Sequence, residues 1–457
     1  MNKIFTVLIL ITVFALLPVL AHAQVPDTYY EGIGTLVLNG TLEFNNSGGG
    51  ARAAGMGGAF VGIADGELGY SWNPAGMMSV DKVKLGVQVA SIGDNFASNI
   101  QDVSPLHSEP NIEPREIKRE HFSLNFAGLV APFEFMDRDW AVGGGYRNVF
   151  DMITEYSTPG FDGTRNEYSQ DRGIDAISAA IAGNVITGVS AGLTINTYLR
   201  NSESSYYNGA SNLYVSQDFI DTTIVDMFWN TNSHYSGVNF DLGLHGDFGM
   251  FSGGFVFHSP LKLKESVKAT IEVIIPPVPF GIINRSTFTY DIPFSYSLGV
   301  AIRPIENLTI AADFNSRPLS EVELKKDYEQ LAFQDTTVNP GWEDVNQFRI
   351  GAEYNYDAGF AEIPVRFGFR NEPSTGKQLL QDTYNDTTST WASTFGDQIT
   401  TNIISFGTGL YFEKIWFDFA YQFGSSSYNR TIDAGTPEIF EIKYDYSRIL
   451  ISSGMYF

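Results

Sequence analysis

The chain of 457 residues contains no cysteine and has a formal net charge of −24, from 52 Asp and Glu against 28 Lys and Arg. The missing thiols exclude disulfides and thiolate metal sites, and the excess of acidic residues argues against nucleic acid as a partner. The 45 Gly, 35 Phe and 23 Tyr favour β-strands with one lipid-facing and one crowded side.

The N-terminal segment 1–23 has the layout of a cleavable secretory signal. Lys3 precedes an apolar run from Ile4 to Leu20, and Ala21-His22-Ala23 forms a small-x-small cleavage site. A membrane anchor is the alternative, which Pro18 and the cleavage site disfavour. No later stretch approaches the roughly 18 to 20 apolar residues that a membrane helix needs, so the sequence predicts an exported chain without membrane helices.

Residues 24–80 do not alternate as a strand would. Small residues dominate the run from Gly48 to Phe60, and Trp72-Asn73-Pro74-Ala75-Gly76 follows. Glycine at this density lets backbone pack against backbone, while large apolar residues in the same segment would anchor it. We therefore expect a plug packed inside a larger structure rather than a linker.

From residue 83 onward, apolar and polar residues alternate in segments of about 9 to 12 positions, the length a tilted strand needs to cross a bilayer. In the clearest case Val238, Phe240, Leu242 and Leu244 alternate with Asn239, Asp241, Gly243 and His245. The sequence predicts fourteen such strands, near 83–92, 121–132, 139–156, 172–185, 187–200, 234–247, 249–274, 289–303, 306–316, 344–355, 361–371, 401–412, 414–424 and 440–457. One of them, 249–274, has to pass through Pro260 and needs a bulge or kink there.

The fold class predicted is therefore all-β, a transmembrane antiparallel β-barrel of about fourteen strands with an N-terminal plug in its lumen. An even strand number lets such a barrel close without an open edge. Short connections are expected on the periplasmic side and long ones outside, at 93–120, 201–233, 317–343, 372–400 and 425–439. The 201–233 loop holds many large apolar residues, so it is expected to cap the barrel or gather an oily ligand.

The C-terminal residues also fit a bacterial barrel. Ile449, Ile451, Met455 and Phe457 share one face of the last predicted strand. A terminal aromatic residue at that place resembles the signal by which the barrel assembly machinery recognises its substrates, so that machinery is an expected partner.

Several motifs resemble the FadL-like family of outer-membrane transporters for long-chain fatty acids and hydrocarbons. The resemblance is carried by the 51–60 run Ala-Arg-Ala-Ala-Gly-Met-Gly-Gly-Ala-Phe, by Ala64-Asp65 and by 72–76, with weaker matches at 259–264, 365–370 and 405–410. After the signal at 1–23, it implies a lumenal hatch at 24–80 and a fourteen-stranded barrel at 81–457. It also implies that Asn73, Pro74 and Ala75 form the hatch motif, and that ligands enter from outside and leave sideways through the wall.

The candidate ligand-binding residues are basic. Arg349, Arg366 and Arg370 fall on polar strand faces, and Lys262 and Lys264 follow Pro260. Charges inside a barrel more often pair with one another and with the plug. The functional alternative is that one of these five side chains holds a carboxylate head group, which arginine matches with two parallel donors.

The sequence holds no convincing catalytic set, and we expect neither enzymatic activity, nor a cofactor, nor a metal site. Gly188-Val189-Ser190-Ala191-Gly192 fits a hydrolase elbow, but the serine falls within a predicted strand. The leading hypothesis is passive uptake of a hydrophobic small molecule across the bacterial outer membrane, with membrane lipid and lipopolysaccharide as neighbours. The alternative is a fourteen-stranded carrier or scaffold that binds cargo proteins in secretion.

Overall fold

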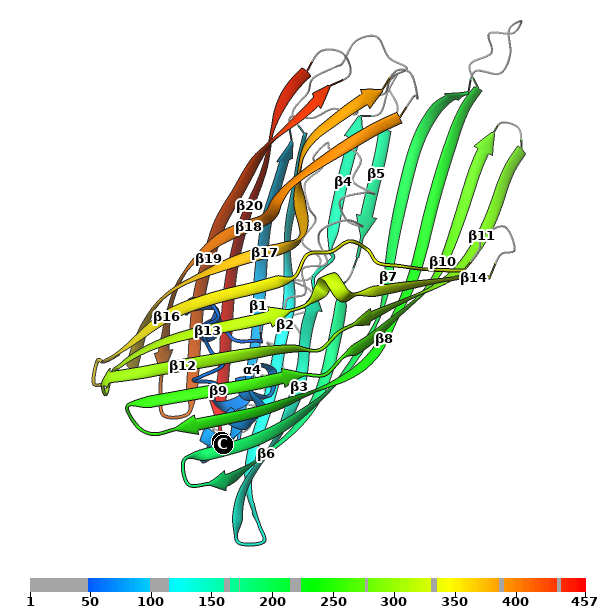
Figure 1. Cartoon of the computed structure of the whole chain (residues 1–457). Helices are drawn as coiled ribbons and strands as arrows, with labels where there is room; N and C mark the ends of the chain where they lie inside the picture. Colours follow the sequence, from blue (N-terminus) through cyan, green and yellow to red (C-terminus); the bar gives the residue numbers. More distant parts are fainter. Residues whose placement is uncertain are drawn as a thin grey trace, which may run out of the picture.

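The computed structural model describes residues 48–98, 115–159, 165–171, 173–213, 223–275, 278–329, 335–385, 390–433 and 437–457. Most of them belong to one sheet that closes on itself as a barrel (Figure 1). The predicted signal at 1–23 and residues 24–47 of the predicted hatch lie outside the described residues. Within the described part, no helix combines the length and the apolar content needed to span a bilayer.

Fourteen antiparallel wall strands form the barrel, as predicted, and six of them are interrupted or extended by a second segment. The first five are β1 (Lys84–Ser98), β2 (Arg115–Phe135), β3 (Arg138–Phe150) with β4 (Thr154–Pro159), β5 (Arg165–Gln170) with β6 (Ile174–Ile186), and β7 (Val189–Leu213). The next five are β8 (Thr223–Asp247), β9 (Phe251–His258) with β10 (Leu261–Ile275), β11 (Val278–Ile292) with β12 (Ser295–Ile305), β13 (Leu308–Arg317) with β14 (Glu323–Tyr328), and β15 (Thr336–Val338) with β16 (Val345–Asp357). The last four are β17 (Glu362–Asn385), β18 (Thr390–Tyr411), β19 (Ile415–Asp433) and β20 (Pro437–Tyr456).

Closure is made by the first and last strands. β1 pairs with β2 on one edge and with β20 on the other, in unbroken register from Lys84↔Tyr456 to Ser98↔Ile442. A closed ladder satisfies every backbone donor and acceptor of the wall, which is the condition for a sheet to stand in lipid.

The strand predicted through Pro260 does break there. β9 ends at His258 and β10 begins at Leu261, and both lie along β8. On β9 the even-numbered Ser252 and Val256 are buried, whereas on β10 the odd-numbered Leu261 and Leu263 are buried. The break therefore shifts the alternation by one residue, as a bulge does.

Three of the five predicted long loops, 201–233, 372–400 and 425–439, are mostly strand, which corrects the prediction. The segment 201–233 belongs to β7 as far as Leu213 and to β8 from Thr223, with Tyr206 opposite Trp229. Antiparallel pairing continues beyond the apolar part of the wall because each further pair satisfies two backbone groups. Residues 214–222, with Tyr214 and Phe219 of the predicted loop, lie outside the described residues.

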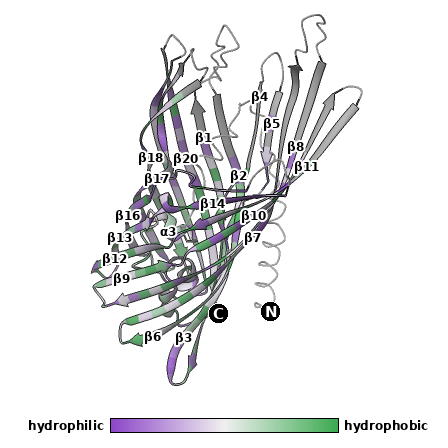
Figure 2. Cartoon of the chain, turned by 45° about the vertical axis from the view of Figure 1, so that its right-hand side comes forward, coloured by the Kyte–Doolittle hydropathy of each residue, from purple (hydrophilic) through white to green (hydrophobic). Residues whose placement is uncertain are grey.

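The wall is apolar outside and polar inside over its lower part. On β8, Val238 is 60% exposed, and Phe240, Leu242 and Leu244 share its outer face, while Asp241 is buried on the inner face. Figure 2 shows hydrophobic residues alternating with polar ones along the lower wall strands. This inside-out pattern is that of a membrane-spanning barrel rather than a soluble sandwich.

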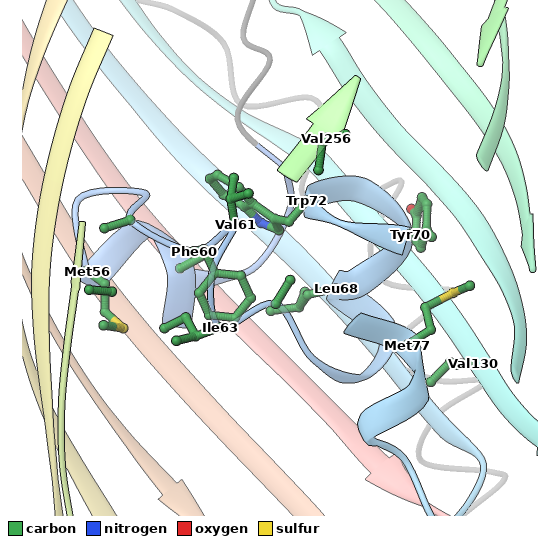
Figure 3. Close-up of a cluster of buried hydrophobic side chains, with 14 of the residues drawn as sticks. Met56, Phe60, Val61, Ile63, Leu68, Tyr70, Trp72, Met77, Val130 and Val256 are labelled. Carbon is green, nitrogen blue, oxygen red and sulfur yellow. The ribbon is translucent and has the colours of Figure 1, made fainter. Parts of the chain in front are cut away.

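Residues 48–80, here named the inner segment, form short helices within the lower barrel (Figure 1). These are α3 (Ala51–Gly55), the 3₁₀ turn η1 (Gly66–Leu68), α4 (Gly69–Trp72) and the 3₁₀ turn η2 (Pro74–Ser79). Their apolar side chains form a buried cluster (Figure 3). In it the ring centres of Phe60 and Trp72 lie 5.7 Å apart, and Met56 and Met77 are fully buried. Wall residues Phe126, Val130 and Val256 complete it.

Candidate ligand path inside the barrel

Polar wall side chains hold the backbone of the inner segment. Thr194 Oγ1 donates to Tyr70 O at 3.0 Å, Ser252 Oγ donates to Gly62 O at 2.8 Å, and Gln422 Nε2 donates to Ala54 O at 2.8 Å. In the reverse sense, Asp313 Oδ2 accepts from Phe60 N at 2.6 Å. An irregular backbone buried away from water needs such partners, so the polar inner face serves first to seat this segment.

Asn73, predicted as part of the hatch motif, joins two parts of the inner segment to the wall. Its Nδ2 donates to Val61 O at 3.2 Å and to Leu244 O on β8 at 3.0 Å, and its Oδ1 accepts from Ala75 N at 3.2 Å. Pro74 follows at the first position of η2, where it loses no hydrogen bond. A Cβ on Gly243 of β8 would lie 2.2 Å from Asn73 Oδ1, so the wall leaves room for this motif.

A network of ion pairs fixes α3 to three wall strands. Arg52 Nη2 lies 2.8 Å from Glu353 Oε1 on β16, and Arg366 on β17 lies 2.6 Å from both Glu353 Oε2 and Asp418 Oδ1 of β19. Tyr411 adds a hydroxyl that accepts from Arg366 at 2.7 Å. Arg366 is thus engaged with two carboxylates, the Tyr411 hydroxyl and Thr408 O, which makes it a structural residue of the network.

The inner segment also holds a buried acid near the start of β1. Lys84 Nζ lies 2.9 Å from Glu67 Oε2 and 5.2 Å from the centre of the Trp416 ring. Burial raises the pKa of the Glu67 carboxyl, and the attraction of Lys84 partly offsets that rise. The pair therefore ties η1 to β1, and Lys84 also contacts a ring of β19.

Arg349 and Arg370 are buried on the same inner face. Arg349 donates to Gln347 Oε1 and to Gly58 O at 3.2 Å, and its guanidinium lies 5.4 Å from the Trp72 ring centre. Arg370 pairs with Glu372 at 2.6 Å. These two arginines and Arg366 are therefore brought together by the fold, and all three have partners.

Two buried amide groups beside Arg349 lack a partner. Asn315 Nδ2 and Gln347 Nε2 are buried donors without a hydrogen-bond acceptor among the described atoms. Asn315 of β13 lies opposite Gln347 of β16, and Gln347 Oε1 is fixed by Arg349. A buried donor without an acceptor is costly unless a ligand or water completes it.

A second cluster of buried apolar side chains, the lumen cluster, lies beyond the inner segment on the side of the long hairpins. Its members come from β3, β6, β7, β8, β10, β11, β16, the η4 turn (Leu319–Glu321) with the residue after it, and the segment between β15 and β16. They are Val149, Phe150, Ile174, Ala176, Tyr198, Tyr235, Leu261, Leu263, Ile292, Leu319, Val322, Trp342 and Val345. Apolar side chains thus gather on the inner face here, together with the buried carboxylate of Glu265, which accepts from Tyr235 Oη at 2.9 Å. Val345 lies two residues from Gln347, so the cluster adjoins the unpaired donors.

Lys262 and Lys264 do not face the lumen. Lys262 is 79% exposed and Lys264 is exposed, while Leu261 and Leu263 between them are buried in the lumen cluster. If β9 simply continued, the even-numbered lysines would face the lumen. The one-residue shift at Ser259–Pro260 turns them to the outside instead. The two lysines therefore lie on the outer surface of β10 and are separated from the three arginines by the wall.

The wall has a seam between β2 and β3. Their pairing ends at Phe126↔Arg147, although β2 continues to Arg115, and the described part of β4 pairs only with β5. Across the seam His121 Nε2 lies 2.8 Å from Asp151 Oδ2. Phe122 on the outer face of β2 is 53% exposed, so the seam begins within the apolar band of the wall.

Comparison with known proteins gives matches in structure. Neither protein-family models nor curated proteins match the sequence. Among solved structures, a Pseudomonas aeruginosa FadL homologue superposes with a TM-score of 0.62 at 13% identity, covering 90% of this chain and 98% of that one. The chain has the FadL-type fold. The P. putida toluene transporter TodX gives 0.60 at 14% identity over 90% and 99% of the two chains, and the Ralstonia pickettii toluene transporter TbuX gives 0.51 at 15% over 91% and 100%.

Within this FadL-type barrel, the sequence analysis missed Asn315, Gln347 and the lumen cluster. Asn315 lies two residues from Asp313, and Gln347 lies two residues from Arg349, so each shares the inner face of its strand with a residue that the alternation already places inside. The alternation could therefore have identified both. The lumen cluster could not be found this way, because its apolar residues alternate with polar ones just as lipid-facing residues do.

Proposed function

We propose that this protein is a bacterial outer-membrane channel for passive uptake of hydrophobic small molecules. The observation that carries the proposal is the lumen cluster, a group of buried apolar side chains on the inner face of the wall beyond the inner segment. An oily solute gains free energy at about 25 cal/mol per Å² of apolar surface removed from water. The fold shared with a FadL homologue and two toluene transporters supports the same role.

The inner segment acts in this proposal as a fixed plug. Its side chains are buried against strands all round the barrel, and it leaves the lower lumen to a packed cluster. The seam between β2 and β3 begins where Tyr70 of the plug stacks on Phe126 at 5.3 Å. Val149 and Phe150 of the lumen cluster lie on β3 directly beyond it. The ligand therefore leaves sideways through the seam, above a plug that stays in place.

The unpaired donors favour an amphipathic substrate such as a long-chain fatty acid. Asn315 Nδ2 and Gln347 Nε2 seek acceptors beside Arg349, and a carboxylate offers two acceptor oxygens and a charge that suits the arginine. The tail would lie on Trp342, Val345 and the rest of the lumen cluster. A secretion scaffold is not favoured, because an apolar interior of this kind has no use in binding a cargo protein from outside.

The test is uptake of a labelled fatty acid and of toluene by cells whose only such channel is this protein. Leu263→Glu places a charge in the lumen cluster, and Asn232→Asp on the outer face of β8 is the control with the same change in net charge. We expect uptake of both solutes to fall at least tenfold with Leu263→Glu and to be unchanged with Asn232→Asp. Equal uptake by both variants would contradict the lumen path.

A further inference from the structure

The outer face of β10, β11 and β14 carries a basic surface just beyond the apolar band. Along the outer face of β8 the residues change from Val238, which is apolar and exposed, to Ser236, which is half-buried, and His234, which is exposed; both of these are polar. Lys264 of β10 lies in register with Ser236. The surface therefore begins at the level where the hydrocarbon ends and lipid head groups stand.

The strand registers show how the charges are arranged. Lys264 lies opposite Thr289 of β11, which lies opposite Lys325 of β14. Adjacent strands are about 4.8 Å apart, so these two lysines start about 10 Å from each other with a hydroxyl between them. In the flanking rows Lys262 lies opposite Asp291, and Lys268 lies opposite Arg285.

The balance of this surface is positive in an acidic protein. It holds five basic residues, Lys262, Lys264, Lys268, Arg285 and Lys325, against four acidic residues, Asp291, Glu323, Asp327 and Glu329, the last of which follows β14 beside Arg285. Two of the lysines are paired, Lys262 with Asp291 at 3.2 Å and Lys325 with Asp327 at 3.0 Å. Lys264 and Lys268 form no ion pair with the side chains that the structure describes. The whole chain, by contrast, has a net charge of −24.

We propose that this basic surface binds the phosphate-bearing head group of a membrane lipid in the leaflet that meets the long hairpins. Lysine ammonium groups bind phosphate as point charges, and basic residues near an anionic membrane surface are attracted to it. The threonine hydroxyl between Lys264 and Lys325 supplies a further donor. A lipid is the occupant because the surface continues the apolar band, so the acyl chains lie on Val238 and Phe240 while the phosphates meet the lysines.

This assignment gives Lys262 and Lys264 a role outside the lumen. It rests on the proposed membrane location, but it is independent of which solute passes through the channel. A lipid bound here would also hold β10 and β11 to the bilayer at the level where the chain breaks at Pro260.

The experiment measures lipid binding to the full-length protein in mild detergent by native mass spectrometry. The probes are lipid A with two phosphates, lipid A with one phosphate, and a phosphatidylcholine of similar chain length. The test variant is Lys264→Gln/Lys268→Gln/Arg285→Gln, the charge-preserving control is Lys264→Arg/Lys268→Arg, and Lys443→Gln on the outer face of β20 is the positional control. Slower migration of the heated than of the unheated barrel on a gel checks that each variant is folded.

We expect the wild-type protein to prefer diphosphorylated lipid A over phosphatidylcholine by at least tenfold, with the single-phosphate form between them. The triple variant should lose that preference, while the two controls keep it. Raising the salt concentration from 50 to 300 mM should weaken lipid A binding to the wild-type protein, because screening shortens the reach of exposed charges. Equal lipid A binding by wild type and triple variant, or full competition by 10 mM inorganic phosphate, would overturn the proposal. Uptake by the triple variant is measured separately, so failure of the channel function would show there alone.

Discussion

Arg366 lies between two buried carboxylates, so its loss should destabilise the barrel far more than loss of a surface arginine. Arg366→Met leaves Asp418 with only Tyr411 as a partner in the buried network. Breaking a buried ion pair on one side costs roughly 3 to 5 kcal/mol. We expect the free energy of unfolding of the detergent-folded protein, measured in urea, to fall by that amount.

The control is Arg303→Met, which removes an exposed pair with Asp247 and should cost about 1 kcal/mol or less. If both variants unfold alike, the network around Arg366 does not stabilise the fold.

Gly243 gives a second test at the level of single residues. Gly243→Ala would place a methyl group 2.2 Å from Asn73 Oδ1, so the plug or β8 must shift, whereas Gly253→Ala on β9 meets only Gly299 O at 3.5 Å. Overpacking costs about 1 to 3 kcal/mol. We expect Gly243→Ala to lower the unfolding midpoint clearly and Gly253→Ala to leave it within error. An unchanged midpoint for Gly243→Ala would mean that Asn73 or β8 can move to accommodate the methyl group without loss of stability.

Among the elements, the inner segment offers a direct test of the proposed exit. A ligand that leaves through the seam between β2 and β3 does not require the inner segment to move. Ala51 N lies 2.8 Å from Ser452 Oγ on β20, and the chain has no other cysteine to interfere. An Ala51→Cys/Ser452→Cys pair is therefore chosen to join the inner segment to the wall, and thiol titration checks that the disulfide has formed. We expect fatty acid and toluene uptake to be the same in the oxidised and reduced forms.

Uptake that stops on oxidation and returns with dithiothreitol would show that the plug must move, and the seam would then be insufficient as an exit. The single variants Ala51→Cys and Ser452→Cys control for the substitutions themselves.

The alternation of apolar and polar residues predicts the wall strands well. It does not predict changes of register within a strand or the contacts between the wall and the inner segment. Val238 to Leu244 are correctly assigned because a strand with one lipid-facing side must alternate. The orientation of Lys262 and Lys264 could not be predicted, because it depends on a one-residue shift at Ser259–Pro260. The contacts between the inner segment and the wall could not be predicted either, because residues such as Ala51 and Ser452 are 401 residues apart in sequence.

At the scale of the whole molecule, the plug should be what keeps the barrel from conducting ions. Fourteen strands enclose more space than wall side chains alone fill, and residues 48–80 occupy the lower lumen with buried side chains. Deleting residues 48–80 should therefore convert a channel that is silent in planar bilayers into one with steady ion conductance. If the deleted form folds and stays silent, side chains of the wall close the lumen without help.

The closure of the barrel by β1 and β20 also has a consequence for biosynthesis. The first strand cannot complete its pairing, and α3 cannot meet Ser452, until the last strand is available. Such a chain has no stable half-made form, because contacts between distant residues repay the entropy of loop closure only when they form. The wall can therefore close only after β20 has formed, which makes the pairing of β1 with β20 a late step of folding.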